Sequence, residues 1–435
     1  MNLEEKLRQL RQAAEKSTRD LELERQLEYL RRLEQMPKTL PSQRVPKGIE
    51  HYVEGEVASN RWGEFFGVRQ MLPFGRPYGK LRIGDVATAD LAPLRLFTED
   101  ASLPKASEIV YLDTETTGLA GGTGTCAFLI GIAAAQGSQL VVRQFFLRDY
   151  PEEKATLAAL AEALEPYSCV ATFNGKTFDV PLLETRYTLA RLKSPFARMQ
   201  HLDLLHPARR LWKLRLESCA LAHLEKEILD VTRVGDISGA EIPGIYFDYL
   251  RTGNARGLQP VFYHNAMDVV TLAALTVELA RIIGAVEEGG CGDGVVESSL
   301  DLFSLSRIFD RAGVRESAVL TCQRALDLGL PEHVAPRALQ HLAYQHKRER
   351  QYERAAEIWD ELARNESAFG IEALEQLAIH HEHRLRDARA ALDLVDLALS
   401  RLETMPSPRS HIERFTYRRE RLRRKMTRQP LEPCP

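Results

Sequence analysis

The stretch Ile109-Val-Tyr-Leu-Asp-Thr-Glu-Thr-Thr-Gly118 decides the fold, because its apolar run ends in two carboxylates, Asp113 and Glu115, just before a glycine. Alternation of side chains along a β-strand places these two carboxylates on the same face. Carboxylate oxygens are the ligands that hold magnesium or manganese, and such ions promote phosphodiester hydrolysis. The stretch therefore predicts a strand end that supplies half of a metal site, although an isolated Asp-x-Glu pair also occurs on ordinary solvated strands.

Two further acidic motifs follow along the chain. Phe173-Asn-Gly-Lys-Thr-Phe-Asp179 comes after a short apolar strand, and Tyr263-His-Asn-Ala-Met-Asp268 opens a helical stretch. An aspartate at the start of a helix, such as Asp179, is ordinarily a cap that accepts backbone amides. The presence of all three motifs favours a metal-binding role for Asp179 instead.

In this order the acidic residues resemble the three exonuclease motifs of the DEDD nucleases, which have a ribonuclease-H-like fold and hydrolyse nucleic acids from the 3′ end. The segments Leu119-Ala-Gly-Gly-Thr-Gly-Thr125 and Phe128-Leu-Ile-Gly131 are similar to the YprB-type bacterial branch, in which this domain precedes helical repeats. The resemblance covers about 180 residues, from near Glu108 to near Ile283. It implies an α/β ribonuclease-H-like mixed sheet with flanking helices, followed by an all-α tetratricopeptide-like C-terminal domain.

The same resemblance implies a two-metal site with two Mg²⁺ or Mn²⁺ ions. The four acids assigned to both catalysis and metal binding are Asp113, Glu115, Asp179 and Asp268. In this hypothesis Asp113 bridges both ions, Glu115 and Asp268 complete one, and Asp179 supports the other. The residues expected to contact substrate are Thr116, Asn174, Lys176 and Tyr263.

The third motif departs from the DEDD pattern, in which a histidine precedes the last aspartate by five residues or a tyrosine precedes it by four. Here Tyr263 is five residues before Asp268 and His264 is four before it. On a helix, positions i and i+4 share a face, so His264 reaches the same site as Asp268 while Tyr263 points away. An imidazole with a pKa near ~6.5 accepts a proton from attacking water more readily than a phenol near ~10. His264 is the candidate catalytic base, with a hydrogen bond to a loop as the alternative.

Other motifs in this region are assigned structural roles. Asp203 lies between His201 and His206, a familiar set of metal ligands. The DEDD pattern already has its four acids, so Asp203 is predicted to order a turn. The glycine-rich loop 118–125 lacks the Gly-Lys-Ser/Thr ending of a P-loop, which argues against an NTPase.

Composition is typical of a multidomain protein without a membrane segment. The 435 residues are 44% apolar, and 58 basic against 61 acidic residues leave a net charge of −3, so overall charge does not indicate a polyanionic partner. The six cysteines form no Cys-x-x-Cys pair, which argues against zinc. Neither a signal-peptide core nor an apolar run long enough to span a bilayer is evident, so we expect a cytoplasmic protein.

The pattern of apolar residues, prolines and glycines predicts five segments. Strands are expected at 109–113, 127–134, 140–147 and 169–173, and a helix at 151–165. In the C-terminal half, Ala318, Ala355 and Ala390 mark three echoing helical segments at intervals of 37 and 35 residues, close to the ~34 of tetratricopeptide repeats. The predicted segments are an amphipathic helical arm (1–36), a linker with a small β-rich element (37–104), the ribonuclease-H-like domain (105–283), a Gly-rich linker (284–297), and the helical repeats with a basic C-terminal helix (298–428).

The predicted activity is divalent-metal-dependent hydrolysis of phosphodiester bonds in nucleic acid, as a 3′–5′ exonuclease on single-stranded ends. The substrate is DNA or RNA, since the motifs do not specify recognition of a 2′-hydroxyl. The helical repeats are either a surface for a protein partner or a stabilising appendage, and the basic run Arg409–Arg428 is either a solvated helix or an additional nucleic-acid contact. Two alternatives stay open: a non-catalytic nucleic-acid-binding and protein-docking scaffold, and an endonuclease that uses the same metal site.

Overall fold

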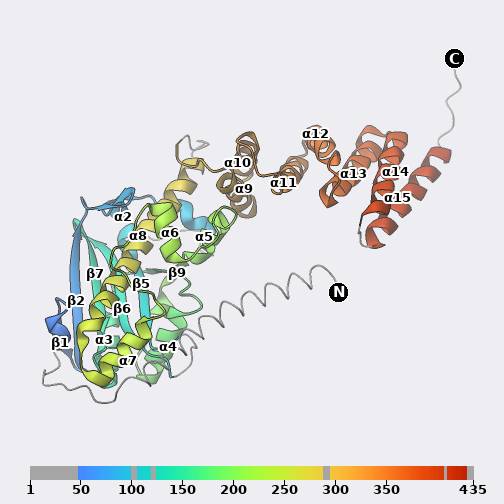
Figure 1. Ribbon diagram of the computed structural model, residues 1–435. Helices are drawn as coiled ribbons and strands as arrows, with labels where there is room; N and C mark the ends of the chain where they lie inside the picture. Colours follow the sequence, from blue (N-terminus) through green and yellow to red (C-terminus); the bar gives the residue numbers. More distant parts are fainter. Residues whose placement is uncertain (1–47, 99–104, 119–123, 288–293, 406–408, 429–435) are drawn as a thin grey trace. The chain divides into compact units, whose positions relative to one another are not determined.

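The computed structural model describes residues 48–98, 105–118, 124–287, 294–405 and 409–428 (Figure 1). The chain forms two compact units. The first contains the described residues up to Arg209 together with Ser218–Arg281, and the second contains Arg210–Glu217 together with the described residues from Ile282 onward. The predicted arm at 1–36 lies outside the described residues.

The first unit is built on a mixed sheet of seven strands in the order β1-β2-β7-β6-β5-β8-β9. Strand β5 pairs antiparallel with β6 and parallel with β8, and β8 pairs parallel with β9. The strands are β1 (Glu56–Asn60), β2 (Gly63–Pro73), β5 (Ile109–Thr116), β6 (Ala127–Gln136), β7 (Gln139–Phe146), β8 (Cys169–Thr172) and β9 (Gln200–Asp203), with a separate two-stranded piece β3 (Pro77–Tyr78) and β4 (Leu81–Arg82).

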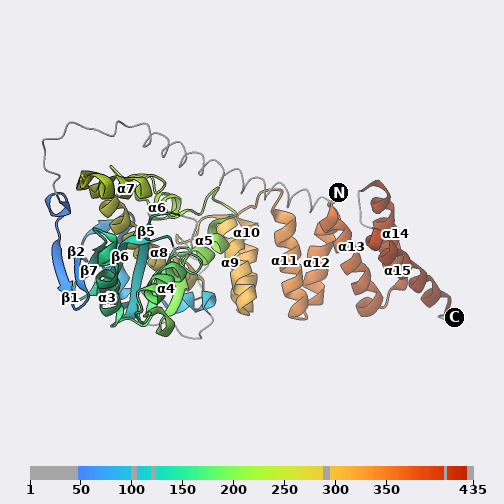
Figure 2. The same ribbon diagram turned by 90° about the horizontal axis from the view of Figure 1, so that it is seen from below.

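Helices cover both faces of this sheet (Figure 2). One core cluster joins Val110 and Leu112 of β5 to α3 (Glu153–Leu164) and α4 (Asp179–Leu189). A second cluster joins β2, β6 and β7 to α7 (Ile242–Thr252) and the start of α8 (Gln259–Glu287). Both faces of the central strands are therefore dry, which explains why their sequences are continuously apolar. The predicted ribonuclease-H-like mixed sheet with flanking helices is confirmed.

The remaining helices of this region are short. They are α2 (Asp85–Thr88), α5 (Leu205–Trp212) and α6 (Leu221–Leu229), with 3₁₀ turns at Ile49–His51, Ala92–Phe97, Ala106–Glu108, Tyr150–Glu152, Phe196–Arg198 and Ala255–Leu258. Among the described residues, one helical stretch, Ala255–Glu287, is long and apolar enough to cross a membrane, and 83% of its most apolar window is buried within the protein. This burial is that of a core helix.

Two predicted boundaries are wrong. The β-rich element assigned to 37–104 is not separate, because β2 pairs with β7 from Phe66 opposite Phe146 to Pro73 opposite Gln139. Phe66 and Val68 need that partner to bury their side chains. The predicted start of the Gly-rich linker at 284 falls inside α8, which continues to Glu287 and in which Val286 is fully buried.

The second unit is all-helical, as predicted. Its helices are α9 (Ser299–Ala312), α10 (Arg315–Asp327), α11 (Ala335–Arg348), α12 (Tyr352–Ala363), α13 (Ala368–His380), α14 (Ala388–Thr404) and α15 (Arg409–Arg428), with a π-helical turn at His381–Leu385. The three echoing segments correspond to α10, α12 and α14. Their buried alanines are Ala318, Ala355 and Ala391, so the third segment is in register one residue later than the sequence alignment placed it.

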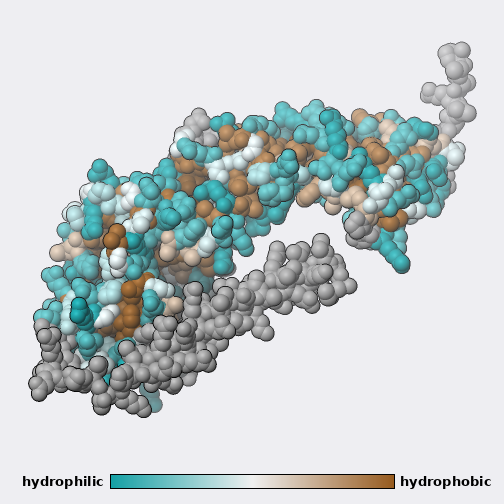
Figure 3. All heavy atoms as spheres, viewed as in Figure 1, coloured by the Kyte–Doolittle hydropathy of each residue, from teal (hydrophilic) through white to brown (hydrophobic). Residues whose placement is uncertain are grey.

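Apolar side chains account for the interior of the helical unit. Trp359, Leu374, Val395 and Leu422 belong to one buried cluster that links α12 to α15. On the face seen in Figure 3, hydrophilic residues are interspersed with small hydrophobic patches. This is the usual outcome when helices bury one stripe each and leave the other in water.

Candidate metal centre

The end of β5 presents its two acids to α8. Val110 and Leu112 point into the core beside α3 and α4, so the alternate positions, Asp113 and Glu115, face the opposite side of the sheet. A register irregularity between Glu115 and Thr116 then disrupts the pairing with β6. Such bulges re-aim side chains at the ends of strands, and this one follows Glu115 directly.

Asparagine 265 of α8 fixes the position of Asp113. The side-chain amide of Asn265 donates to Oδ2 of Asp113 at 3.0 Å and to its carbonyl oxygen at 3.3 Å. Oδ1 of Asn265 accepts in turn from Gln144 at 2.9 Å. The backbone of Gly131 lies against this amide, since a Cβ there would be 2.2 Å from Oδ1 of Asn265. A glycine in β6 thus makes room for the residue that orients the first acid.

Three predicted residues converge on one point. Ligand atoms of Glu115, His264 and Asp268 all lie within 4.8 Å of one another, close enough to share a metal ion. Nε2 of His264 is 3.4 Å from Oδ2 of Asp268, as expected for positions i and i+4 of a helix. Glu115 is buried, while the two α8 residues retain partial exposure. The group therefore has access from outside on one side only.

Asp179 reaches the end of β5 from the other face of the sheet. It is the first residue of α4, is buried, and accepts a hydrogen bond from the hydroxyl of Thr114. Its charge acts on both Asp113 and Glu115. The four predicted acids are thus gathered around one strand end, with Asp113 and Asp179 outside the group formed by Glu115, His264 and Asp268.

Burial and mutual repulsion make these carboxylates reluctant to ionise. Burial, followed by the charges of Asp268, Glu115 and Asp179, raises the pKa of Asp113 well above its usual value. Burial, followed by Asp268 and Asp179, raises the pKa of Glu115 to about 8. Burial also raises the pKa of Asp179 to about 6, although the hydrogen bond from Thr114 opposes this shift. Oxygen ligands with unbalanced negative charge suit a hard divalent cation, so this donor set fits magnesium or manganese.

A carboxylate outside the predicted motifs holds the histidine. Nδ1 of His264 lies 2.9 Å from Oδ1 of Asp236, which also accepts from the backbone amide of Ile237 at 2.9 Å. Burial alone would raise the pKa of Asp236, but the hydrogen bond and charge of His264, the backbone amide of Ile237 and the charge of Arg233 together outweigh burial and leave this pKa below its usual value. A proton on Nδ1 leaves Nε2 as the acceptor that faces Asp268. In this tautomer the basic nitrogen of the imidazole faces Asp268 at the candidate metal centre.

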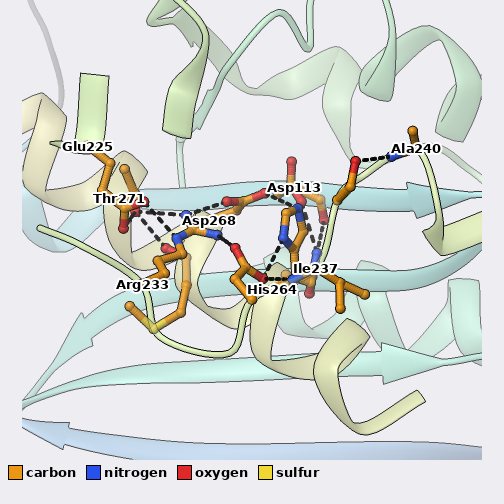
Figure 4. Close-up of polar contacts among 12 residues, drawn as sticks. Asp113, Glu225, Arg233, Ile237, Ala240, His264, Asp268 and Thr271 are labelled. Atoms are coloured by element: carbon orange, nitrogen blue, oxygen red, sulfur yellow. Dashed lines mark hydrogen bonds and ion pairs between the residues drawn. The ribbon is translucent and has the colours of Figure 1, made fainter. Parts of the chain in front are cut away.

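Arg233 provides the cation at this site, and sequence analysis missed it. Its guanidinium contacts Asp268 at 2.6 Å, Glu225 at 2.6 Å and Asp236 at 3.1 Å, and its side chain is only 6% exposed. Arg233 and His264 both point toward Asp268 (Figure 4). The arginine therefore orders Asp268 and compensates part of the negative charge around it.

The residues expected to contact substrate do not form one group as the metal-ligand candidates do. Asn174 and Lys176 are exposed on the turn after β8, and their backbone amides donate to the carboxylate of Asp203 at 2.8 and 3.0 Å. Asp203 thus holds this turn, and it also accepts from the backbone amide of Leu205 at 3.1 Å, at the local turn before α5 that the sequence assigned to it. Thr116 is buried and donates to the carbonyl of Gly118 at 3.1 Å, which directs its hydroxyl along the chain.

Tyr263 lies on a different side of α8 from His264. It is 38% exposed and lines a pocket of about 280 Å³ together with Leu72, Tyr78 and Phe262. The helical offset between neighbouring residues explains this placement. Of the two swapped residues in the third motif, the histidine is the one at the metal centre.

The sequence patterns assigned no role to four residues that contact the candidate site. They are Gln144, Arg233, Asp236 and Asn265. Asn265 could have been found, because it stands beside His264 in the third motif. Arg233 and Asp236 lie in the loop between α6 and α7, where Gly235 has a φ of +77°. Their only signal was a pair of opposite charges around a glycine, which is too common to single out.

Two comparisons with known proteins agree with this geometry. A family model described as RNase_H superfamily matches residues 110–280, a range that includes β5, β8, α4 and the part of α8 that carries His264 and Asp268. The protein named Uncharacterized protein YprB from Bacillus subtilis (strain 168) is 29% identical over 321 residues, covering 73% of this chain and 75% of that protein. Residues 110–280 are therefore similar to the RNase_H superfamily, and the chain is similar to YprB over most of its length.

Proposed function

We propose that this chain is a divalent-metal-dependent 3′–5′ exonuclease that acts on single-stranded ends of DNA or RNA. A ribonuclease-H-superfamily domain indicates chemistry on nucleic acid. The observation that carries the more specific proposal is the convergence of Glu115, His264 and Asp268 within 4.8 Å, next to an oriented Asp113. This arrangement combines metal ligands with a proton acceptor.

The residues divide into ligands and positioning groups. Asp113, Glu115 and Asp268 would hold one ion, and Asp113 with Asp179 would hold a second. Divalent ions in such a site generate a nucleophile from water at neutral pH and stabilise the charge that develops on the leaving oxygen. The acids themselves need only stay in place and ionised.

His264 is the proton acceptor in this proposal. Nε2 takes a proton from the attacking water, and the carboxylate of Asp236 on Nδ1 stabilises the imidazolium that results. Arg233 keeps Asp268 in its ligating orientation, and Asn265 does the same for Asp113. His264, Asp268 and Asp113 are therefore each supported by a second residue that fixes the rotamer.

The test is digestion of 5′-labelled single-stranded DNA and RNA with magnesium or manganese. Wild type should give a ladder that shortens from the 3′ end. Asp113→Asn should reduce the rate by about 10³-fold or more, the scale of losing an electrostatic group at a reacting centre. His264→Ala should slow turnover, and Glu184→Gln, on an exposed turn of α4, serves as the matched control.

Circular single-stranded DNA separates the remaining alternatives. An exonuclease leaves the circle intact, whereas an endonuclease with the same metal site cuts it. Binding of either nucleic acid without cleavage under both metals would overturn the enzymatic proposal in favour of a scaffold.

A further inference from the structure

The helical unit contains a pocket that the nuclease proposal does not use. It has a volume of about 280 Å³ and is bounded by α11, α12, α13 and the π-helical turn that follows α13. Its apolar lining includes Ala355, Trp359 and Ile379, and its polar residues include Lys347 and Arg384. None of the residues that line this pocket is acidic. An apolar cavity with cations at its rim suits a ligand that carries both an apolar group and a negative charge.

The π-helical turn His381–Leu385 builds one wall of the pocket. Such turns are rare and occur often at functional sites. This one contributes His383 and Arg384 to the pocket, while Glu382 of the same turn is buried and only 3% exposed. The turn ends at Arg386, whose φ of +57° is left-handed. The unusual geometry directs two basic residues outward and one acid inward.

Cations of α15 neutralise the inward acid. The carboxylate oxygens of Glu382 lie 3.3 Å from the guanidinium of Arg418, 2.5 Å from that of Arg421 and 3.9 Å from Nζ of Lys425. A buried carboxylate with several cationic partners is costly to disturb, so this network holds the π-helical turn in place. His383 of the pocket wall also lies 3.6 Å from this carboxylate, which leaves Lys347 and Arg384 as the principal cations of the pocket.

The two principal cations at the rim are oriented. The guanidinium of Arg384 lies 3.8 Å over the ring of Tyr352, a stacking that leaves the edge donors of the guanidinium for an anion. Nζ of Lys347 donates to Gln376 at 2.6 Å, which uses one of its three donors. Little side-chain entropy remains to be lost when a carboxylate binds here.

We propose that this pocket binds an acidic peptide segment of a partner protein, with one large apolar side chain seated against Ala356 and Ile379 and flanking carboxylates at Lys347 and Arg384. A nucleic acid is the less suitable occupant, because base stacking needs an open aromatic face. Arg384 covers one face of Tyr352, and Trp359 is 2% exposed with Tyr344 packed against it edge to face. The pocket size suits a single apolar side chain.

The test uses the full-length protein and a fluorescein-labelled, capped pentapeptide with phenylalanine between two pairs of aspartates. Fluorescence anisotropy should show saturable binding. Replacing the phenylalanine by glycine, or the aspartates by lysines, should abolish it. A short labelled oligothymidylate should bind no differently to wild type and to the pocket variants.

Two kinds of variant separate the pocket from a general basic surface. Arg384→Ala and Lys347→Ala should each weaken peptide binding about tenfold, the loss of one charge-assisted hydrogen bond. Ala356→Phe should block the cavity and abolish binding although both cations remain. Arg389→Ala, an exposed arginine on α14 paired with Asp393, is the matched control and should bind like wild type.

Circular dichroism and a melting curve check that each variant is folded. Binding must also persist in Asp113→Asn, since the pocket is independent of the metal centre. Absence of peptide binding, equal binding of the glycine peptide, or an unchanged affinity in folded Ala356→Phe would overturn the proposal. Selective binding of the oligothymidylate that Arg384→Ala removes would identify a nucleic-acid site instead.

Discussion

Substituting alanine for Gly131 should damage the metal centre through one added methyl group. The new Cβ would lie 2.2 Å from Oδ1 and 2.9 Å from Cγ of Asn265. Carbon and oxygen atoms in ordinary contact are separated by more than 3 Å, so the amide must retreat by about 1 Å. It cannot do so freely, because Gln144 and Asp113 hold its two ends at 2.9 and 3.0 Å.

The cost can be estimated from its parts. Overpacking of a buried site costs about 1–3 kcal/mol, and loss of one buried hydrogen bond about 1–3 kcal/mol. Replacing a strand glycine by alanine returns about 0.5–1 kcal/mol of backbone entropy. We therefore expect the substitution to lower the free energy of unfolding by roughly 2–4 kcal/mol. The displaced amide of Asn265 should also move Asp113, and a displacement of up to about 1 Å should slow turnover about 100-fold.

Urea unfolding and the rate of cleavage of labelled single-stranded DNA measure the two effects. Gly67→Ala is the matched control, since a Cβ at this strand glycine meets its nearest atom at 3.7 Å. In the double variant Gly131→Ala/Asn265→Ala the clash is gone, so the two substitutions should cost less together than the sum of each alone. Equal stability of Gly131→Ala, Gly67→Ala and wild type, with additive effects in the double variant, would refute the role assigned to Asn265.

Three other outcomes follow from the charges at the site. Without metal, the free energy of unfolding should increase as the pH falls from about 8 toward 5. The reason is that the folded chain then protonates Glu115, whose pKa is raised to about 8, while a glutamate in the unfolded chain titrates near ~4.3. Magnesium should reduce this pH dependence in melting curves, and a stability that increases with pH would contradict the assignment. Asp236→Asn should lower kcat about 10- to 100-fold by releasing His264, with little change in manganese affinity by calorimetry; an unchanged kcat would mean that the hydrogen bond is incidental. Arg233→Met should cost about 3–5 kcal/mol because Glu225 is left buried without its cation, and Glu225→Gln in the same chain should restore part of the urea midpoint.

Local sequence patterns were sufficient to predict the central strand of the sheet and the acids at its end. The apolar run that ends at Asp113 and Glu115 predicted a strand, and β5 includes all of it. Spacing on a helix placed His264 beside Asp268 and turned Tyr263 away, which agrees with the contacts. These inferences succeeded because alternation along a strand and the i, i+4 spacing of a helix are properties of neighbouring residues.

Contacts between distant residues were not predictable in the same way. The pairing of Phe66 with Phe146 depends on register, which no local pattern specifies. The network around Arg233 brings together residues from a loop and two helices. The basic run in α15 looked like a solvated or nucleic-acid-binding helix, yet three of its cations turn inward to Glu382. In each case the partner is set by tertiary packing.

The short segment Arg210–Glu217 belongs to the second unit although residues of the first precede and follow it. Arg215 in this segment pairs with Asp301, which lies 86 residues later in the chain. During synthesis the segment therefore emerges from the ribosome well before α9 exists to receive it. Truncation after Arg281 would likewise leave Arg215 without its carboxylate. The two units therefore cannot be separated by a single cut in the chain.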